Sequence, residues 1–126
     1  MKPRVLVIDD DPGVRRILRD ILAADGYEVL LSADGATALE TAAQGELNAA
    51  LLDYSLPDMD GLAVLRGLLG AKPNLPVVMV TGHASYELAV GAMKLGAFNF
   101  VSKPVDDESL LAIVRNAVER DSLQRR

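Results

Sequence analysis

The sequence predicts a single α/β domain with a parallel β-sheet that helices cover on both faces. Five short apolar segments alternate with five segments of helical periodicity along the 126 residues. The apolar segments are continuous instead of alternating with polar residues, which is typical of strands buried on both faces. The length suits one domain with a substantial core, and no linker, repeat or low-complexity segment divides it.

In the first half of the chain the pattern predicts three strands and two helices. The first strand covers residues 4–8 (RVLVI), and Asp11 then serves as the N-cap of a helix with proline at its first position. Gly26 ends that helix, and Gly45 ends the next one. The remaining elements are a strand at 27–31, a helix at 35–44 and a strand at 49–53.

The second half of the chain supplies two more strands and three more helices. A loop rich in turn residues at 55–61 (SLPDMDG) leads into a helix that runs to about residue 69. Gly91 lies inside a later helix and costs about 1 kcal/mol relative to alanine, so we expect that helix to shift easily. The remaining elements are a strand at 76–81, a helix at 84–95, a strand at 98–101 and a helix that begins near residue 106.

The C-terminal residues 115–126 (RNAVERDSLQRR) keep a helix-forming composition, with no glycine or proline to end the helix. Either this helix frays in solvent or the natural chain continues into another segment. We place the domain at residues 1–120 and treat 121–126 as a helical extension, a candidate start of a linker to an effector domain. A free-standing domain is equally compatible with the sequence.

Composition and missing motifs exclude several classes of function. The sequence has no cysteine, which excludes disulfides and thiolate metal sites, and its net charge of −5 argues against direct nucleic-acid binding. No apolar segment is long enough to cross a membrane, and the N-terminal MKPRVLVIDDD lacks a signal-peptide cleavage site, so we expect a cytoplasmic protein. Neither GxxxxGK(S/T) nor GxGxxG is present, and the acidic turn DDDPG would repel a flavin phosphate.

Polar side chains follow four of the five predicted strands at the points where the strands end. In an open parallel sheet, ligands bind beyond the carboxyl ends of the strands, so we expect these side chains to converge at one edge. In chain order they are Asp9 and Asp10, Asp53, Thr81, and Ser102 with Lys103. Asp11 is expected only to cap a helix, and Asp58 and Asp60 only to form turns.

This set of residue types indicates phosphoryl transfer. Clustered carboxylates repel one another unless one is protonated or a cation joins them, and ligand sets made only of oxygen suit Mg²⁺ or Mn²⁺. The ammonium of Lys103 and the hydroxyl of Thr81 could hold phosphoryl oxygens. A carboxylate can itself be the nucleophile and form an aspartyl phosphate.

Four fragments of the sequence, in order and at suitable spacing, resemble response-regulator receiver domains of two-component systems over essentially the whole chain. The fragments are VLVIDDD, LLDYSLPDMDG, VVMVTGH and FVSKP. The resemblance implies a flavodoxin-like (βα)5 three-layer sandwich whose five parallel strands have the order 2-1-3-4-5.

The resemblance also implies a role for each residue of the cluster. Asp53 would be the phosphoryl acceptor. Asp10 and Asp53 would bind Mg²⁺ directly together with the backbone carbonyl of Ser55, and Asp9 would reach the metal through a water molecule. His83, near this pocket, is a further candidate that would tune dephosphorylation together with Ser55.

Other residues would transmit the phosphorylation signal. Lys103 would pair with a phosphoryl oxygen, and its peptide bond to Pro104 is expected to be cis. Thr81 would swing toward the phosphoryl group, and Phe100 would change rotamer with it. The family often has tyrosine at the position of Phe100, so this chain keeps the ring but loses any hydrogen bond from the hydroxyl.

The implied partner is a sensor histidine kinase or phosphotransfer protein whose phosphohistidine supplies the phosphoryl group. Phosphorylation would then change an output surface formed by the helix at 84–95, the strand at 98–101 and the last helix. An effector domain or a second copy of the chain would bind there. The sequence TGH and the helical tail resemble those of receivers attached to transcription activators, which implies control of transcription. We expect a signalling protein that catalyses at most its own phosphorylation and dephosphorylation, rather than an enzyme acting on a free substrate.

Two other functions compete with this interpretation. A haloacid-dehalogenase-type phosphatase also uses a strand-end aspartate, a threonine, a lysine and Mg²⁺. Its DxDx(T/V) signature would begin at Asp9, but Gly13 occupies the last position and Asp53 would have no role. A receiver that only binds partners is the third alternative, and the intact set of acids, threonine and lysine disfavours it.

Overall fold

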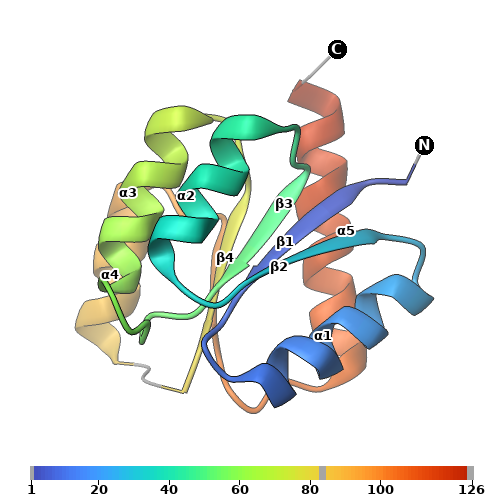
Figure 1. Cartoon of the computed structure of the whole chain (residues 1–126), viewed down its shortest axis with the longest axis horizontal. Helices are drawn as coiled ribbons and strands as arrows, with labels where there is room; N and C mark the ends of the chain where they lie inside the picture. Colours follow the sequence, from blue (N-terminus) through green and yellow to red (C-terminus); the bar gives the residue numbers. More distant parts are fainter. Residues whose placement is uncertain (1, 83–84, 125–126) are drawn as a thin grey trace.

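The computed structural model describes residues 2–82 and 85–124, and its strands and helices alternate strictly along the chain (Figure 1). The alternation confirms the α/β class expected from the sequence. The elements are β1 (Arg4–Ile8), α1 (Pro12–Ala24), β2 (Glu28–Ser32), α2 (Gly35–Gln44), β3 (Ala49–Leu52), α3 (Gly61–Ala71), β4 (Val77–Thr81), α4 (Tyr86–Leu95), β5 (Asn99–Ser102) and α5 (Asp107–Gln124).

The five strands form one parallel sheet in the order β2-β1-β3-β4-β5, which confirms the flavodoxin-like topology. Ile8, the last residue of β1, pairs with Ser32 of β2 on one side and with Leu52 of β3 on the other. At the far side of the sheet, Thr81 pairs with Ser102. This register brings the carboxyl ends of all five strands to the same edge.

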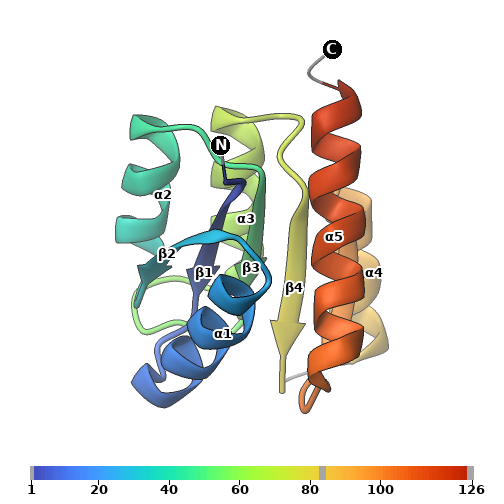
Figure 2. The same cartoon turned by 90° about the vertical axis from the view of Figure 1, so that its right-hand side faces the viewer.

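Two hydrophobic clusters lie on the two faces of the sheet. Leu6 and Ile8 of β1 belong to the cluster covered by α2, α3 and α4, whereas Val5 and Val7 belong to the one covered by α1 and α5. Figures 1 and 2 show these two groups of helices on opposite sides of the strands. Since neighbouring residues of a strand point to opposite faces, burial of both faces explains why the strand segments are apolar without interruption.

Side-chain caps set the starts of the helices. The Asp11 carboxylate accepts hydrogen bonds from the backbone N–H groups of Gly13 at 2.8 Å and Val14 at 3.3 Å, which confirms its expected capping role. Ser85 caps α4 by accepting from Leu88 N–H at 3.1 Å. The expected start of this helix at residue 84 lies outside the described residues.

The structure shifts some expected boundaries by one or two residues. β2 begins at Glu28 rather than at residue 27, because the N–H of Tyr27 donates to the carbonyl of Leu22 at 3.2 Å and so still belongs to the end of α1. Gly26 lies within that exit with φ at 96°, a left-handed conformation that favours glycine. Gly45, in contrast, ends α2 in an extended conformation that any residue adopts.

Helix α5 runs through residue 120 without a break and ends at Gln124. Asp121 is only 3% exposed, and its carboxylate accepts a hydrogen bond from the side-chain N–H of Asn48 at 2.9 Å. The side-chain oxygen of Asn48 in turn accepts from the N–H of Arg4 at 2.8 Å. The last turns of α5 are therefore bonded to the amino edge of the sheet, and the assignment of 121–126 to an extension stays a prediction. None of the helices within the described residues is long and apolar enough to span a membrane.

Replacing Asn48 by alanine is expected to lower the free energy of unfolding by about 1–3 kcal/mol, because a donor to a buried carboxylate and an acceptor for Arg4 N–H are lost together. Urea unfolding followed by circular dichroism measures the change. Asn116→Ala, at an exposed position of α5, is the control and should change stability little. Equal stability of the two variants would contradict a structural role for the Asn48 contact.

Candidate functional site

Three carboxylates meet at the carboxyl edge of the sheet. The backbone ladder carries two of them there, because Asp53 N–H donates to the carbonyl of Ile8 at 2.9 Å and Asp9 N–H donates to that of Ser32 at 3.1 Å. One carboxylate oxygen from each of Asp9, Asp10 and Asp53 lies within 4.8 Å of the others. The structure thus brings together acids that are separated by more than forty residues in the sequence.

The three acids differ in exposure. Asp9 is 3% exposed and Asp53 is 8% exposed, whereas Asp10 is exposed to solvent. In the described part of the chain, this is the one group of three or more acids or histidines close enough together to hold an ion. A set of hard oxygen donors with one open side fits a divalent cation such as Mg²⁺, which retains several water ligands.

Lys103 supplies positive charge to the cluster. Its ammonium donates to a carboxylate oxygen of Asp9 at 2.7 Å and to one of Asp53 at 3.2 Å. Lys103 is held there because its N–H continues the ladder to the carbonyl of Thr81 at 2.9 Å. The peptide bond between Lys103 and Pro104 is cis, as expected.

The pKa of Lys103 reflects two opposing effects. Burial alone lowers the pKa of the ammonium, but the hydrogen bonds and charges of Asp9 and then Asp53 outweigh burial and leave the pKa above its usual value. Folding raises this pKa, so the ion pairs stabilise the protein fully at pH values below the usual lysine pKa. This stabilisation is lost as the pH rises through the raised pKa of the folded state. The ammonium is therefore charged at neutral pH.

The remaining oxygens of the buried acids are held by their own loops. The second oxygen of Asp9 accepts from Asp11 N–H at 3.0 Å, and that of Asp53 accepts from Ser55 N–H at 3.3 Å. Arg15, which sequence reasoning did not single out, donates from its guanidinium to the backbone carbonyl of Asp9 at 2.6 Å. Its position one turn into α1 carries no sequence signal that would separate it from an ordinary surface arginine.

The other expected site residues lie near the same edge. Thr81 is fully buried at the end of β4, and Phe100 is partly buried on β5, on the face covered by α4. Ser55 is exposed and forms an isolated bridge with Asp60. His83 lies outside the described residues. The roles of these residues as metal ligand, switch or modulator stay predictions.

Two acids of the loop at 55–61, expected only to form turns, bind backbone amides at the starts of helices. Asp60 caps α3 by accepting from Ala63 N–H at 2.8 Å. The Asp58 carboxylate accepts from Gly35 and Ala36 N–H at the start of α2, a contact that spans more than twenty residues of sequence. The sequence predicted only a turn here, because no local pattern reveals which distant helix a loop carboxylate will meet.

The capping role of Asp11 also bears on the phosphatase alternative. Asp11 is the second aspartate of the DxDx(T/V) match, and its carboxylate is bound to the first turn of α1 rather than directed into the cluster of acids. A phosphatase of that kind would need this carboxylate at the reacting group. This position of Asp11 argues against the phosphatase alternative, and the acceptor role of Asp53 stays a prediction.

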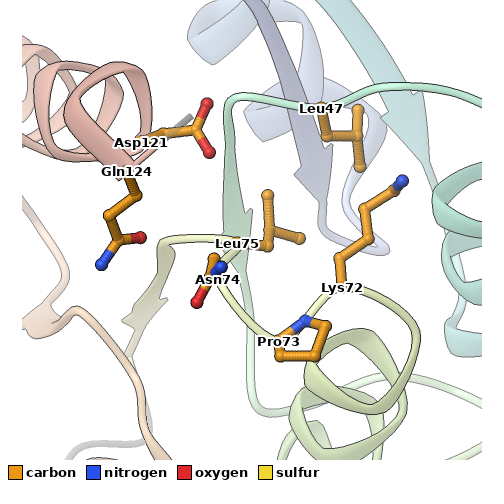
Figure 3. Close-up of a pocket in the computed structure, with 7 residues that line it drawn as sticks. All are labelled: Leu47, Lys72, Pro73, Asn74, Leu75, Asp121 and Gln124. Atoms are coloured by element: carbon orange, nitrogen blue, oxygen red, sulfur yellow. The ribbon is translucent and has the colours of Figure 1, made fainter. Parts of the chain in front are cut away.

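A pocket at the opposite edge of the sheet lacks a comparable cluster of carboxylates. It lies between the end of α5 and the segment that leads into β4, where Figure 3 shows Asp121 and Gln124 on one side and Lys72 and Pro73 on the other. Asp121 is the one carboxylate that lines it, and this carboxylate is already bound to Asn48. The carboxyl edge is thus the better candidate for a phosphoryl site.

Comparisons with known proteins agree with the geometry. A family model described as the response regulator receiver domain matches residues 5–115. The regulatory protein AtoC of Escherichia coli K12 is 35% identical over 122 residues, which cover 97% of this chain and 26% of AtoC. The response regulator MprA of Mycobacterium ulcerans is 39% identical over 124 residues, which cover 98% of this chain and 53% of MprA. The chain thus spans between about a quarter and a half of these relatives.

Solved structures show the same architecture. A CheY-like response regulator receiver domain protein from Methanospirillum hungatei superposes with a TM-score of 0.95 at 31% sequence identity, over 98% of this chain and 99% of that one. This neighbour is almost wholly covered by the match. The fold described above therefore matches that receiver domain protein along nearly its whole chain.

Replacing Asp10 by asparagine is expected to raise the free energy of unfolding in metal-free buffer. The change removes repulsion between carboxylates at about 5 Å, which amounts to roughly 1 kcal/mol at a solvent-exposed position. It should also remove most of the stabilisation by Mg²⁺, which for an intact site is about 1.4 kcal/mol when the free ion exceeds its dissociation constant tenfold. Urea unfolding with EDTA and with MgCl₂ measures both effects.

Glu40→Gln, which neutralises an exposed acid on α2, serves as the matched control and should leave the Mg²⁺ effect unchanged. If Asp10→Asn destabilises the metal-free protein and leaves the Mg²⁺ effect intact, the cluster is not the metal site.

Proposed function

This chain belongs to the response regulator receiver domain family, and on that premise we propose that it signals by accepting a phosphoryl group on Asp53. The observation that carries the proposal is the position of Asp53, which lies beside two further carboxylates and one ammonium at the ligand-binding edge of the sheet. Receiver domains are signalling domains and not enzymes that turn over a free substrate.

The hydrogen bonds of the two buried acids support Asp53, rather than Asp9, as the acceptor. Asp9 is held by close bonds on both oxygens, at 2.7 Å from Lys103 and 3.0 Å from Asp11 N–H. The corresponding bonds of Asp53, from Lys103 and from Ser55 N–H, are longer, at 3.2 and 3.3 Å, and its side chain is more exposed. An oxygen of Asp53 is therefore freer to attack.

In the proposed reaction an oxygen of Asp53 attacks the phosphorus of a phosphohistidine. A P–O bond forms and the P–N bond breaks, and the imidazole leaves with the electron pair and takes up a proton. Lys103 moves from the Asp53 carboxylate to a new phosphoryl oxygen and keeps its bond to Asp9. Asp10, Asp53 and the Ser55 carbonyl would hold Mg²⁺, with Asp9 contributing through a water molecule, and the ion would supply positive charge to offset that of the phosphoryl oxygens.

An apolar groove beside the site supports a protein as the phosphoryl donor. Lys103 and Pro104 line the groove together with residues of α1, among which Ile17 is 59% exposed. A donor that brings a phosphohistidine to Asp53 must rest on the surface next to Lys103. We assign this groove to the sensor histidine kinase or phosphotransfer protein that the family uses.

The output surface is proposed on α4, β5 and α5. Thr81 ends β4, and Phe100 of β5 packs in the cluster that α4 covers. Helix α4 exposes a patch that includes Tyr86, 84% exposed, and Met93. A shift of Thr81 toward a phosphoryl oxygen, followed by Phe100, would alter this patch. An effector domain or a second copy would bind to the changed surface. A relative named transcriptional regulatory protein GlrR, from Escherichia coli K12 and longer than this chain, supports control of transcription.

Incubation with MgCl₂ and a small phosphodonor such as phosphoramidate is expected to add one phosphoryl group, acid-stable and base-labile, to the unaltered chain. EDTA should abolish the gain, and Asp53→Asn should show none. Intact mass spectrometry measures it. Asp20→Asn, an exposed acid on α1, is the control and should be phosphorylated normally.

No mass gain in a chain that still binds Mg²⁺ would favour the partner-binding alternative. Metal-dependent release of phosphate from p-nitrophenyl phosphate that survives Asp53→Asn and fails in Asp9→Asn would favour the phosphatase.

Replacing Ile17 by glutamate is expected to slow transfer from an autophosphorylated histidine kinase by tenfold or more, because a charge in the centre of an interface is desolvated without a partner. The kinase used is the one that transfers fastest to the unaltered chain in a panel. Labelling by phosphoramidate should not change. Leu31→Glu, an exposed leucine on β2 outside the groove, is the matched control, and equal slowing by both variants would contradict the assignment.

A further inference from the structure

The loop between β3 and α3 carries both the proposed acceptor and a proposed metal ligand. Several of its contacts are internal. Gly61 N–H donates to the Tyr54 carbonyl at 2.8 Å, Ser55 forms a bridge with Asp60, and Ser55 N–H donates to Asp53 at 3.3 Å. These contacts fold the loop onto itself, and Leu56 and Met59 pack against the core on one face of the sheet.

Asp53, at the start of the loop, bonds to Ile8 and Lys103, and Asp58, further along it, bonds to helix α2. One oxygen of the Asp58 carboxylate accepts from Gly35 N–H at 2.8 Å, and the other accepts from Ala36 N–H at 2.9 Å. These bonds hold the pKa of Asp58 below its usual range. The next amide of α2, that of Thr37, is bound by Asp34 at 2.8 Å. Two carboxylates thus cap the first turn of α2, one from the adjacent chain and one from the loop.

Packing at Gly35 shows that this contact is close-fitting. A Cβ atom at Gly35 would collide with the side chains of Met59, next to Asp58 in the loop, and of Val64 in α3. Gly61, at the other end of the loop, is equally constrained, because a Cβ there would lie 2.5 Å from Tyr54 Cα. Both glycines allow close approach of backbone and side chains, so the loop lies directly against the start of α2.

We propose that Asp58 is a positioning residue for the phosphorylation site, which holds the loop of Asp53 and Ser55 in place by binding the first two amides of α2. This proposal rests on the function proposed above for Asp53 and deepens it. Asp58 itself touches neither the phosphoryl group nor the metal. It acts through the loop, in which Ser55 contacts Asp53 and Asp60 while Asp58 bonds to α2.

A consequence is that α2 and the site are mechanically connected. A displacement of the first turn of α2 pulls on both oxygens of Asp58, and the loop transmits this to the Ser55 carbonyl and to the bond between Ser55 N–H and Asp53. Residues that orient a metal ligand without touching the metal commonly change metal affinity or activity by tenfold or more when they are replaced.

Asp34 provides a matched control for this proposal. It caps the same helix end with one carboxylate bond, to Thr37 N–H, but the bond is local to α2 and does not involve the loop. Asp34→Ala therefore weakens the start of α2 and removes one negative charge, without releasing the loop. Asp58→Asn keeps one acceptor oxygen in place and loses the charge, so it separates geometry from electrostatics.

The first measurement is amide hydrogen exchange of the metal-free, unphosphorylated chain. Asp58→Ala should speed exchange at Ser55 and Gly61 by about tenfold, Asp58→Asn by less, and Asp34→Ala only within α2. This measurement does not depend on phosphoryl chemistry. Equal exchange at these two amides in Asp58→Ala and Asp34→Ala would overturn the proposal.

The second measurement is the dissociation constant of Mg²⁺, determined by titration of the intrinsic tyrosine fluorescence. We expect an increase of about tenfold in Asp58→Ala, a smaller one in Asp58→Asn and little change in Asp34→Ala. Equal increases in both Asp58 variants would show that only the charge matters and would overturn the positioning role. If the exchange pattern is as expected but the unaltered chain cannot be phosphorylated, the function proposed for Asp53 fails while the contact between loop and α2 stands.

Discussion

Repulsion among the carboxylates of Asp9, Asp10 and Asp53 is the constraint on which the site depends. Their oxygens lie within 4.8 Å of one another, and Lys103 provides one positive charge against three negative ones. The backbone ladder of the sheet holds Asp9 and Asp53 at the strand ends in spite of this repulsion. The excess negative charge favours binding of a divalent cation, and a cation bound there could also bind phosphoryl oxygens.

The two buried acids differ in how tightly hydrogen bonds hold their carboxylates. Asp9 is held by short bonds on both oxygens and serves as the anchor of Lys103, whereas Asp53 has longer bonds and a small exposed area. Lys103 also borders the apolar groove of α1, so one side chain connects the acids with the surface that a donor would occupy. Lys103 therefore belongs both to the groove proposed to bind the donor and to the hydrogen bonds of the proposed acceptor, Asp53.

Support for the site comes from both faces of the sheet. On one face, Asp58 ties the loop of the acceptor to the start of α2, and on the other, Arg15 of α1 binds the carbonyl of Asp9. At the opposite edge, Asn48 and Asp121 bind the end of α5 to β1 and β3. The acids are thus flanked by contacts with α1 on one face and α2 on the other, whereas α4, with its exposed Tyr86, lies at the side proposed to change.

The sequence by itself determined the order of elements, the cap at Asp11, and the strand ends that carry Asp9, Asp53 and Lys103. These features follow from local patterns, because burial on both faces makes strands continuously apolar and topology places their carboxyl ends together. Only the tertiary structure decided that Asp58 reaches α2 and that Asp121 is buried against Asn48, since such contacts depend on which distant backbone amide or side chain happens to lie within hydrogen-bond distance. The local sequence predicts a turn at Asp58 and a solvated helix end at Asp121, but it cannot predict which distant group each carboxylate will bind.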